Sequence, residues 1–459
     1  MHSAKLTTAK YLLSLFTVFG LQFTAHAQEN SPYSRYGVGD LTPNQNVVNR
    51  AMGGIAAGYL DNVTAYQSLN SVNPATYSNL SIYAPFPFQK IFNTVFELGA
   101  EADIRSLKSA SLSKKFTNTN ALFSYLQIGF PLASKKMERK GINWGMVLGF
   151  KPVSRINYNI EKDERLAGID SLKTVYQGSG GLTQAFIGTG FKYKNFSFGI
   201  NTGYMFGNKD YSTRLTFIND TVSYYASNSA NKTSIGGVFL NAGIQYLINT
   251  GNKGKLVLGA YGSLKQNLKA SQDIVRETFV HDATSNADLR IDSVYESNNN
   301  KGTMVYPSTF GAGFTYQDGG GHWLAGVDYE ATNWSEYRLY GQQDFVQNTW
   351  TIRGGVQYLP AKRGSSANKY FNFVKYRAGF NYSPGYIKLG GNNLPEYSGS
   401  IGAGFPLTGK RIGSEYVVLN TALEIGSRGK ANSTIRENIT RFSIGLSMNA
   451  RWFEKRKYD

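Results

Sequence analysis

Cysteine is absent from this 459-residue sequence, histidine occurs only four times, and charged residues make up only 17% of the chain. Without a thiol, the chain has no disulfide scaffold, no thiolate nucleophile and no cysteine-ligated metal site. Four scattered histidines are too few for a histidine-rich metal centre. Beyond the amino terminus no window holds about 20 mostly apolar residues, which excludes a helical inner-membrane protein.

The chain is instead rich in glycine, with 50 residues, and in aromatic residues, at 14%. Soluble proteins average about 7% glycine and about 25% charged residues. This composition is typical of an all-β wall and not of a helical enzyme. The glycine clusters at 178–181 and 319–321 match no nucleotide-binding fingerprint, and no catalytic constellation is present. We therefore predict no catalytic residue, no metal site and no cofactor.

Positive charge is in excess, with a formal net charge of +18. The densest basic groups are 135–140, 362–363 and 455–457, and the remaining cations are spread along the chain. A nucleic-acid-binding protein would gather its cations into one stripe. We therefore predict no nucleic-acid partner and interpret these groups as solvated turns.

Residues 1–27 have the features of a secretory signal peptide. A weakly basic start with Lys5 and Lys10 precedes an apolar stretch that closes on Ala25-His26-Ala27. The apolar stretch is short, and the small residues fit an A-x-A cleavage site. We expect cleavage after Ala27 and export of the remaining chain.

From about Lys90 onward, apolar and polar residues alternate with a period of two, which indicates β-strands. In 350–358 one face carries Trp350, Ile352 and Tyr358, and the other carries Thr, Arg, Gly and Gln. These segments are about twice as long as the strands of soluble sandwiches and reach the 9 to 11 residues needed to cross a bilayer. Their aromatic ends fit interfacial girdles.

Fourteen such segments predict an all-β fold, a transmembrane up-and-down antiparallel β-barrel in the outer membrane. Long polar connections at 161–181, 212–231 and 271–302 are expected as external loops, and short ones as periplasmic turns. The predicted strands are 90–107, 121–132, 142–160, 182–193, 196–211, 232–248, 254–270, 303–317, 322–337, 349–360, 373–388, 396–407, 414–427 and 437–453.

Short motifs give the chain a resemblance to the FadL/TodX family of outer-membrane transport proteins, and to its Bacteroidetes-type relatives. The resemblance covers most of the exported chain and depends on the order of the motifs, because each one alone is weak. The motifs are 31–37 (SPYSRYG), 50–54 (RAMGG), 73–75 (NPA), 306–311 (YPSTFG), 326–329 (GVDY) with 333–335 (NWS), and 376–380 (YRAGF).

This resemblance implies an N-terminal hatch, residues 28–88, inside a fourteen-stranded barrel, residues 89–459. Frequent glycine and proline before residue 88 agree with a folded plug. The alternative is an unstructured periplasmic extension. The residues that match the family's hatch motif are Gly53, Gly54, Asn73, Pro74 and Ala75.

The third predicted strand contains Pro152, which has no N–H to donate to a neighbouring strand. In the family, a kink in the third strand is thought to open the wall towards the membrane. One interpretation is that Pro152 marks such a lateral opening. The other is that Pro152 lies where the strand leaves the wall above the membrane.

Several charged residues fall on the predicted inward face, where charges need water or partners. One interpretation is that they form ion pairs that hold the hatch. The other is that Arg353 or Arg377 binds a ligand carboxylate, because a guanidinium presents a fork to it. The residues are Asp328, Glu330, Arg353, Lys375, Arg377, Glu424 and Arg441.

The first functional hypothesis is passive uptake of small hydrophobic compounds, fatty-acid-like or aromatic, with outer-membrane lipid as the surrounding partner. The alternative is a FadL-like barrel that is a partner in protein export, such as type IX secretion, or in outer-membrane assembly. A general diffusion porin is disfavoured by the predicted hatch.

Overall fold

The computed structural model describes residues 31–60, 68–80, 82–83, 90–91, 94–109, 115–166, 170–218, 224–251, 254–282, 287–361, 369–407, 416–430, 433 and 435–450. The predicted signal peptide, 1–27, and both ends of the predicted hatch lie outside these residues. Within them, no helix is both long and apolar enough to cross a membrane.

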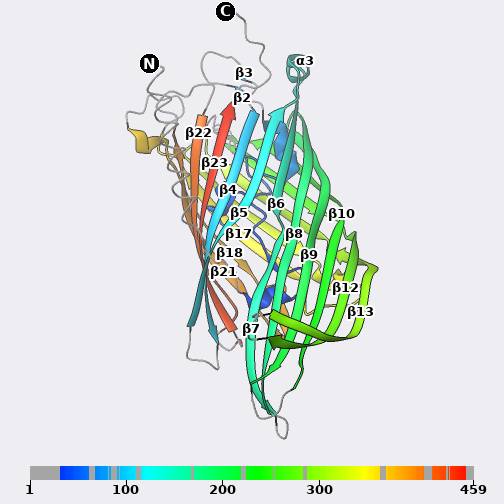
Figure 1. Ribbon diagram of the computed structural model, residues 1–459. Helices are drawn as coiled ribbons and strands as arrows, with labels where there is room; N and C mark the ends of the chain where they lie inside the picture. The colour runs from blue at the N-terminus through cyan, green and yellow to red at the C-terminus, as the bar shows by residue number, and fades with distance from the viewer. Residues whose placement is uncertain are drawn as a thin grey trace, which may run out of the picture.

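Fourteen antiparallel wall strands form a closed barrel, which confirms the predicted fold (Figure 1). It closes where β4 pairs with the last strand, β23, from Thr94 with Ala450 to Ser109 with Ile435. The strands are β4 (Thr94–Ser109), β5 (Lys115–Pro131), β6 (Ile142–Pro152) with β7 (Ser154–Leu166), β8 (Asp170–Tyr193), β9 (Phe196–Phe217), β10 (Ala226–Asn249), β11 (Lys255–Ser263) with β12 (Gln266–Asp282), β13 (Ala287–Tyr306) with β14 (Thr309–Gln317), β15 (Trp323–Thr332), β17 (Thr349–Tyr358), β18 (Lys375–Ser383), β21 (Glu396–Pro406), β22 (Tyr416–Arg428) and β23 (Ile435–Ala450).

Alternation along each strand sorts side chains to the two faces of the wall. On β23, Phe442 and Ile444 are exposed on the outside, whereas Ser443 and Ser447 are buried inside. Large apolar side chains cover the outside of most of the wall strands. Such an outward apolar band is suited to contact with lipid.

Three of the fourteen wall strands are interrupted, and the interruption at Val153 changes the pairing of the wall. β6 pairs with β5 on one side and β8 on the other. Beyond Val153, β7 still pairs with β8 but pairs with no part of β5 among the described residues. The other two interruptions separate β11 from β12 and β13 from β14.

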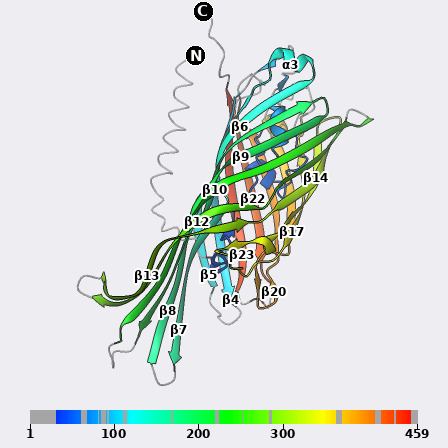
Figure 2. The ribbon, with the colours of Figure 1, turned by 90° about the vertical axis from the view of Figure 1, so that its right-hand side faces the viewer.

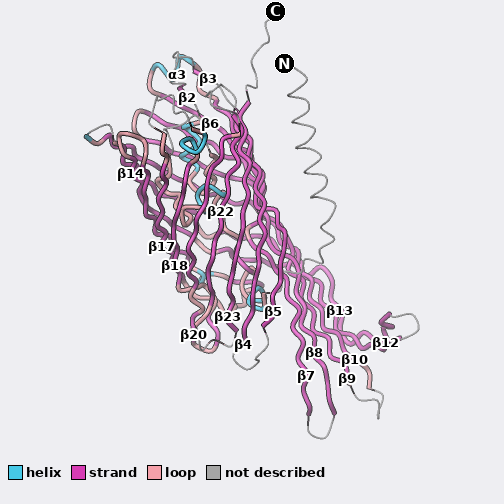
Figure 3. The backbone as a smooth tube through the Cα atoms, turned by 90° about the vertical axis from the view of Figure 1, so that its left-hand side faces the viewer, coloured by secondary structure: helices cyan, strands magenta, loops and turns pink. Residues whose placement is uncertain are grey.

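Beyond these interruptions, β7, β8, β9, β10, β12 and β13 continue as a sheet that projects from the barrel, here called the wing (Figure 2). Figure 3 shows the same projection from the opposite side. The wing corrects one prediction: most of 161–181, 212–231 and 271–302 is strand and not loop. Sequence periodicity missed these strands because polar residues also occupy buried positions, such as Thr174, which weakens the contrast between apolar and polar positions.

The described parts of residues 31–80 lie inside the barrel, where Figure 1 shows them in blue. Inward glycines of the wall allow this close packing, because a Cβ on Gly199 would lie 2.3 Å from the Pro74 carbonyl carbon and one on Gly259 1.9 Å from the Ala57 oxygen. The elements of this N-terminal segment are η1 (Pro32–Arg35), β1 (Asp40–Leu41), α2 (Val47–Arg50) and η2 (Pro74–Asn79).

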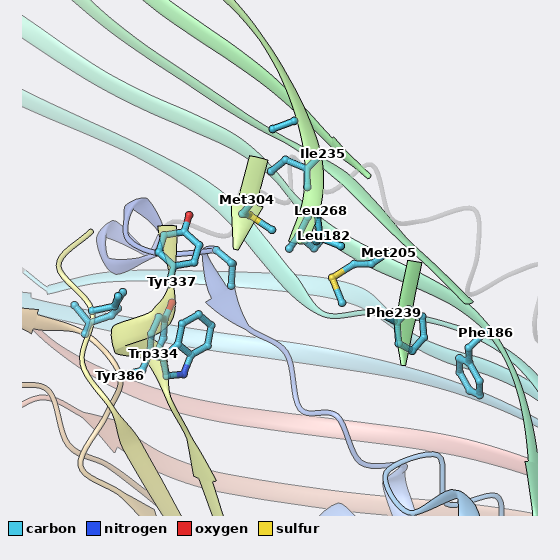
Figure 4. Close-up of a cluster of buried hydrophobic side chains, with 14 of the residues drawn as sticks. Leu182, Phe186, Met205, Ile235, Phe239, Leu268, Met304, Trp334, Tyr337 and Tyr386 are labelled. Carbon is cyan, nitrogen blue, oxygen red and sulfur yellow. The ribbon is translucent and has the colours of Figure 1, made fainter. Parts of the chain in front are cut away.

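The largest buried apolar cluster lies where the N-terminal segment meets the base of the wing. Figure 4 shows Trp334, Tyr337 and Tyr386 grouped together, with Leu182 and Met205 on wall strands. Small elements complete the fold: β2 (Ile82–Tyr83), β3 (Lys90–Ile91), α3 (Lys135–Arg139), η4 (Trp334–Glu336), β16 (Arg338–Leu339), η5 (Tyr370–Phe373), β19 (Lys388–Leu389) and β20 (Asn392–Asn393).

Candidate functional site in the barrel lumen

Arg50, at the end of α2, joins the N-terminal segment to two wall strands. Its guanidinium lies 2.5 Å from Glu101 on β4 and 2.6 Å from Glu424 on β22. Arg441, on β23 between them, lies 3.5 Å from Glu424 and 3.1 Å from Asp103. The predicted inward residues Glu424 and Arg441 are therefore brought together in one ion-pair network.

Asp40, on β1, is the second charged anchor of the N-terminal segment. One carboxylate oxygen lies 2.5 Å from Arg105 of β4, and the other lies 2.7 Å from Arg428 of β22. Glu437 of β23 lies 3.1 Å from Arg428. The N-terminal segment thus contributes one cation and one anion, and each lies between two opposite charges of the wall.

Asp328 and Glu330 are successive inward residues of β15 with different partners. Asp328 is fully buried and accepts hydrogen bonds from the backbone N–H groups of Ala56, at 2.5 Å, and Ala57, at 2.8 Å. Glu330 accepts hydrogen bonds from Tyr261, at 2.6 Å, and from Arg353, at 2.8 Å. Asp328 therefore holds the backbone of the N-terminal segment, whereas Glu330 orients Arg353.

Lys375 and Arg377, on β18, lie apart from Arg353. Both are buried, and Arg377 donates to Gln357, at 2.9 Å, and to Asn420, at 3.1 Å. The two side chains border a small cavity of about 20 Å³. The structure thus separates two arginines that the sequence offered as equivalent ligand-binding candidates.

The residues matched to the family's hatch motif are buried at two places. Gly53 and Gly54 have positive φ angles of 67° and 91° after α2, where the chain turns beside β17 and β18. Asn73 caps η2 and donates to the Ala57 carbonyl at 2.7 Å, while Pro74 opens η2 and Ala75 is fully buried. Both places connect separate stretches of the N-terminal segment to the wall.

A cavity of about 340 Å³ lies between the N-terminal segment and the wall. Its lining is amphipathic. Apolar and aromatic side chains that border it include Leu41, Val153, Met205, Phe239, Tyr306 and Trp334. Charged side chains that border it include Arg50, Glu330, Arg353, Glu424, Arg428 and Arg441.

Arg353 is one of the arginines that border this cavity. Its Nη2 is bound to Glu330, and its Nη1 is buried without a hydrogen-bond acceptor among the described residues. Guanidinium groups bind carboxylates through such paired N–H donors. The lining of the cavity thus combines apolar side chains with arginines and carboxylates.

Pro152 lies at the end of β6, beside the cavity-lining Val153. Its carbonyl accepts a hydrogen bond from the Thr42 hydroxyl, at 2.8 Å, and the Val153 carbonyl accepts one from the Thr42 N–H, at 3.1 Å. Arg155 donates to the Phe123 carbonyl of β5, at 2.7 Å, across the unpaired stretch. The N-terminal segment and Arg155 therefore supply hydrogen bonds that the wall lacks at this break.

Sequence reasoning missed most charged residues of the network, including Arg428 and Glu437 on the last two wall strands. Glu101, Asp103 and Arg105 alternate on β4 and all face inward, a signal that was present in the sequence. Arg50 and Asp40 gave no such signal, because they belong to no regular strand series. Only the fold brings Asp40 beside Arg428, because nearly all of the barrel sequence lies between the two residues in the chain.

The wing carries charged pairs and exposed apolar side chains. Asp288 of β13 interacts with His281, at 2.9 Å, and with Arg214, and these contacts lower the pKa of its carboxyl group below the usual value. Val294 is 71% exposed and Tyr225 62% exposed. Over 287–302, β13 has a strand partner only on its β12 side among the described residues.

A family model described as BamG matches residues 8–459. Among solved structures, the CymD monoaromatic hydrocarbon channel has a TM-score of 0.50 at 13% identity, covering 91% of this chain and 100% of its own. A TodX deltaS2S3 mutant monoaromatic hydrocarbon channel has a TM-score of 0.53 at 15% identity, and the match covers 89% of this chain and 99% of that one. A Pseudomonas aeruginosa FadL homologue has a TM-score of 0.51 at 11% identity, and the match covers 90% of this chain and 99% of that one. No curated protein matches. The expected likeness to FadL/TodX barrels is thus confirmed for the fold.

Proposed function

This chain belongs to the BamG family, and we propose that it serves in the outer membrane as a passive channel for small hydrophobic molecules. The observation that carries this proposal is the amphipathic cavity beside the interrupted strand β6–β7. Solved structures with the same fold include channels named for monoaromatic hydrocarbons, which supports the same class of cargo.

In this proposal, the apolar side of the cavity receives the body of the ligand. Removal of apolar surface from water releases roughly 25 cal/mol per Å², so partition into lipid drives passage without ATP or a cofactor. The ligand leaves sideways at Val153, where β7 no longer pairs with β5. Pro152 marks this exit, and Arg353 orients ligands that carry a carboxylate.

The direct test is uptake by cells that carry or lack the chain. Radiolabelled toluene and a fatty acid are the two probes, and a hydrophilic sugar of similar size is the control. The proposal expects faster entry of one or both hydrophobic probes and unchanged entry of the sugar. Equal entry of all three compounds with and without the chain contradicts it.

A second candidate function is that of a partner barrel in protein export or outer-membrane assembly, and the wing is the observation that favours it. A free strand edge and exposed apolar side chains promote aggregation in water unless another element or a partner covers them. Leu289 and Val294 lie on this edge strand and are more than half exposed. A partner protein that covers them would remove apolar surface from water.

The wing hypothesis is tested with Leu289→Ser and Val294→Ser together. Because both side chains are exposed, the barrel should fold normally. Loss of a stoichiometric co-purifying subunit from native membranes would support the partner role. Unchanged uptake in the same variant would separate this role from transport.

A further inference from the structure

Cations gather at the short-turn end of the barrel, the end opposite the wing. Lys136 and Arg139 lie on α3, and Lys140 caps it. Lys194 forms the turn between β8 and β9, where its φ angle is 53°. We call Lys136, Arg139, Lys140 and Lys194 the basic rim. In outer-membrane barrels the short-turn end faces the periplasm.

A backbone hydrogen bond brings the two turns of the basic rim together. The N–H of Lys194 donates to the Gly141 carbonyl, at 3.0 Å, directly after Lys140. Ser134 caps α3 by accepting from the Met137 N–H at 3.3 Å, which fixes the orientation of the short helix. Lys140 and Lys194 therefore lie on neighbouring turns, although more than fifty residues separate them in the sequence.

The rim differs from the wing in how its charges are balanced. In the wing, Lys173 lies 3.2 Å from Glu161, and Arg290 lies 2.8 Å from Glu296. Lys136, Arg139 and Lys140 are exposed and form no ion pair within the part of the chain that the structure describes, and Glu138 is the one acidic residue of α3 beside them. Like charges held close together repel one another, and an acidic surface placed against them relieves that repulsion.

We propose that the basic rim docks the acidic surface of a periplasmic protein. The position of α3 favours a protein over lipid head groups. Tyr193 and Phe196, on either side of Lys194, are exposed aromatic residues at the ends of β8 and β9, where the membrane interface is expected. The other three cations belong to α3, between the end of β5 and the start of β6. Figure 1 shows α3 at the tip of the barrel, on the connection that leads out of β5 and into β6. Passive uptake requires no such partner, so this inference goes beyond the transport function.

Photo-crosslinking in native membranes tests this proposal. The crosslinking residue p-benzoylphenylalanine replaces Lys136 in the full chain. We expect a protein adduct whose crosslinked peptide, identified by mass spectrometry, is acidic. With Arg139→Glu and Lys140→Glu added, its yield should fall about tenfold or more, because like charges would then face each other.

The matched control places Lys162→Glu and Arg165→Glu in the wing, at exposed positions on the opposite end. This control should leave the adduct unchanged, and heat-modifiable mobility on gels checks that each variant forms a barrel. A lipid adduct alone, no adduct, or a protein adduct that survives the rim reversal overturns the proposal.

Discussion

The Arg50 guanidinium lies 2.6 Å from the Glu424 carboxylate, although 374 residues separate the two positions in the chain. Both side chains are buried, and Arg50 contacts Glu101 at the same time. The contact connects a short helix inside the lumen to the wall on both sides of the closing strand, β23. Arg50 therefore couples the N-terminal segment to barrel closure, as Asp40 does through Arg105 and Arg428.

Replacing Arg50 with Gln should loosen the N-terminal segment. Loss of one partner of a buried ion pair costs about 3–5 kcal/mol. Arg441 stays 3.5 Å from Glu424 and Arg155 stays 2.8 Å from Glu101, so we expect a loss near the lower end of that range. We expect faster proteolysis of residues 31–80 in the folded barrel and higher ion conductance in planar bilayers. Arg165→Gln, in the exposed part of the wing, is the control. Equal conductance and protection in both variants would contradict the anchoring role.

Glycine positions offer a steric test of the same packing. An Ala Cβ at Gly199 would lie 2.3 Å from the backbone of Pro74, whereas at Gly399 nothing lies within 4 Å. Overpacking typically costs about 1–3 kcal/mol. Gly199→Ala should therefore lower the thermal midpoint measured by heat-modifiable mobility, and Gly399→Ala should not. Identical midpoints would show that η2 is not packed against β9 as described.

Pro152→Val tests the interrupted strand. Valine supplies a backbone N–H and a β-branched side chain, both of which favour continuous pairing. We expect slower uptake of toluene or a fatty acid in a correctly assembled variant. Pro131→Val, at the far end of β5, is the matched control. Unchanged uptake with Pro152→Val would remove this residue from the exit route.

Arg353 and Arg377 should differ in ligand binding, since only Arg353 borders the large cavity. A hydrogen bond to a charged group contributes about 1.5–3 kcal/mol. Arg353→Gln should therefore weaken the binding of a fatty-acid probe by about tenfold or more, and Arg377→Gln should leave it nearly unchanged. Isothermal titration in detergent measures both. Retained binding in the double variant would assign both arginines a structural role.

Strand periodicity predicted the wall well, because lipid on one face and a polar lumen on the other produce a strong period of two. Trp350, Ile352 and Tyr358 were placed on one face, and the structure exposes all three together. The inward positions of Asp328 and Arg353 followed from the same alternation. The alternation did not predict their partners. Asp328 binds Ala56 because the N-terminal segment packs against the wall, and Arg353 binds Glu330 because of the register between strands.

Two features required three-dimensional information. The wing strands alternate weakly in polarity, since a buried position such as Thr174 carries a polar side chain. The ion pairs of Arg50 and Asp40 involve residues that lie outside any periodic segment. Charge alone could not place them, because each depends on where the N-terminal chain enters the lumen.

The central claim is that hydrophobic ligands pass the lumen beside β1 and leave at the break between β6 and β7. Leu41 of β1 and Ser154 of β7 are register partners, so Leu41→Cys with Ser154→Cys places two thiols at a distance suited to a disulfide in a chain that has no other cysteine. The decisive measurement is uptake of a radiolabelled hydrophobic probe by the same cells before and after reduction. The account predicts slow uptake in the oxidised protein and recovery on reduction. Equal uptake in the two states, with disulfide formation verified, would contradict it.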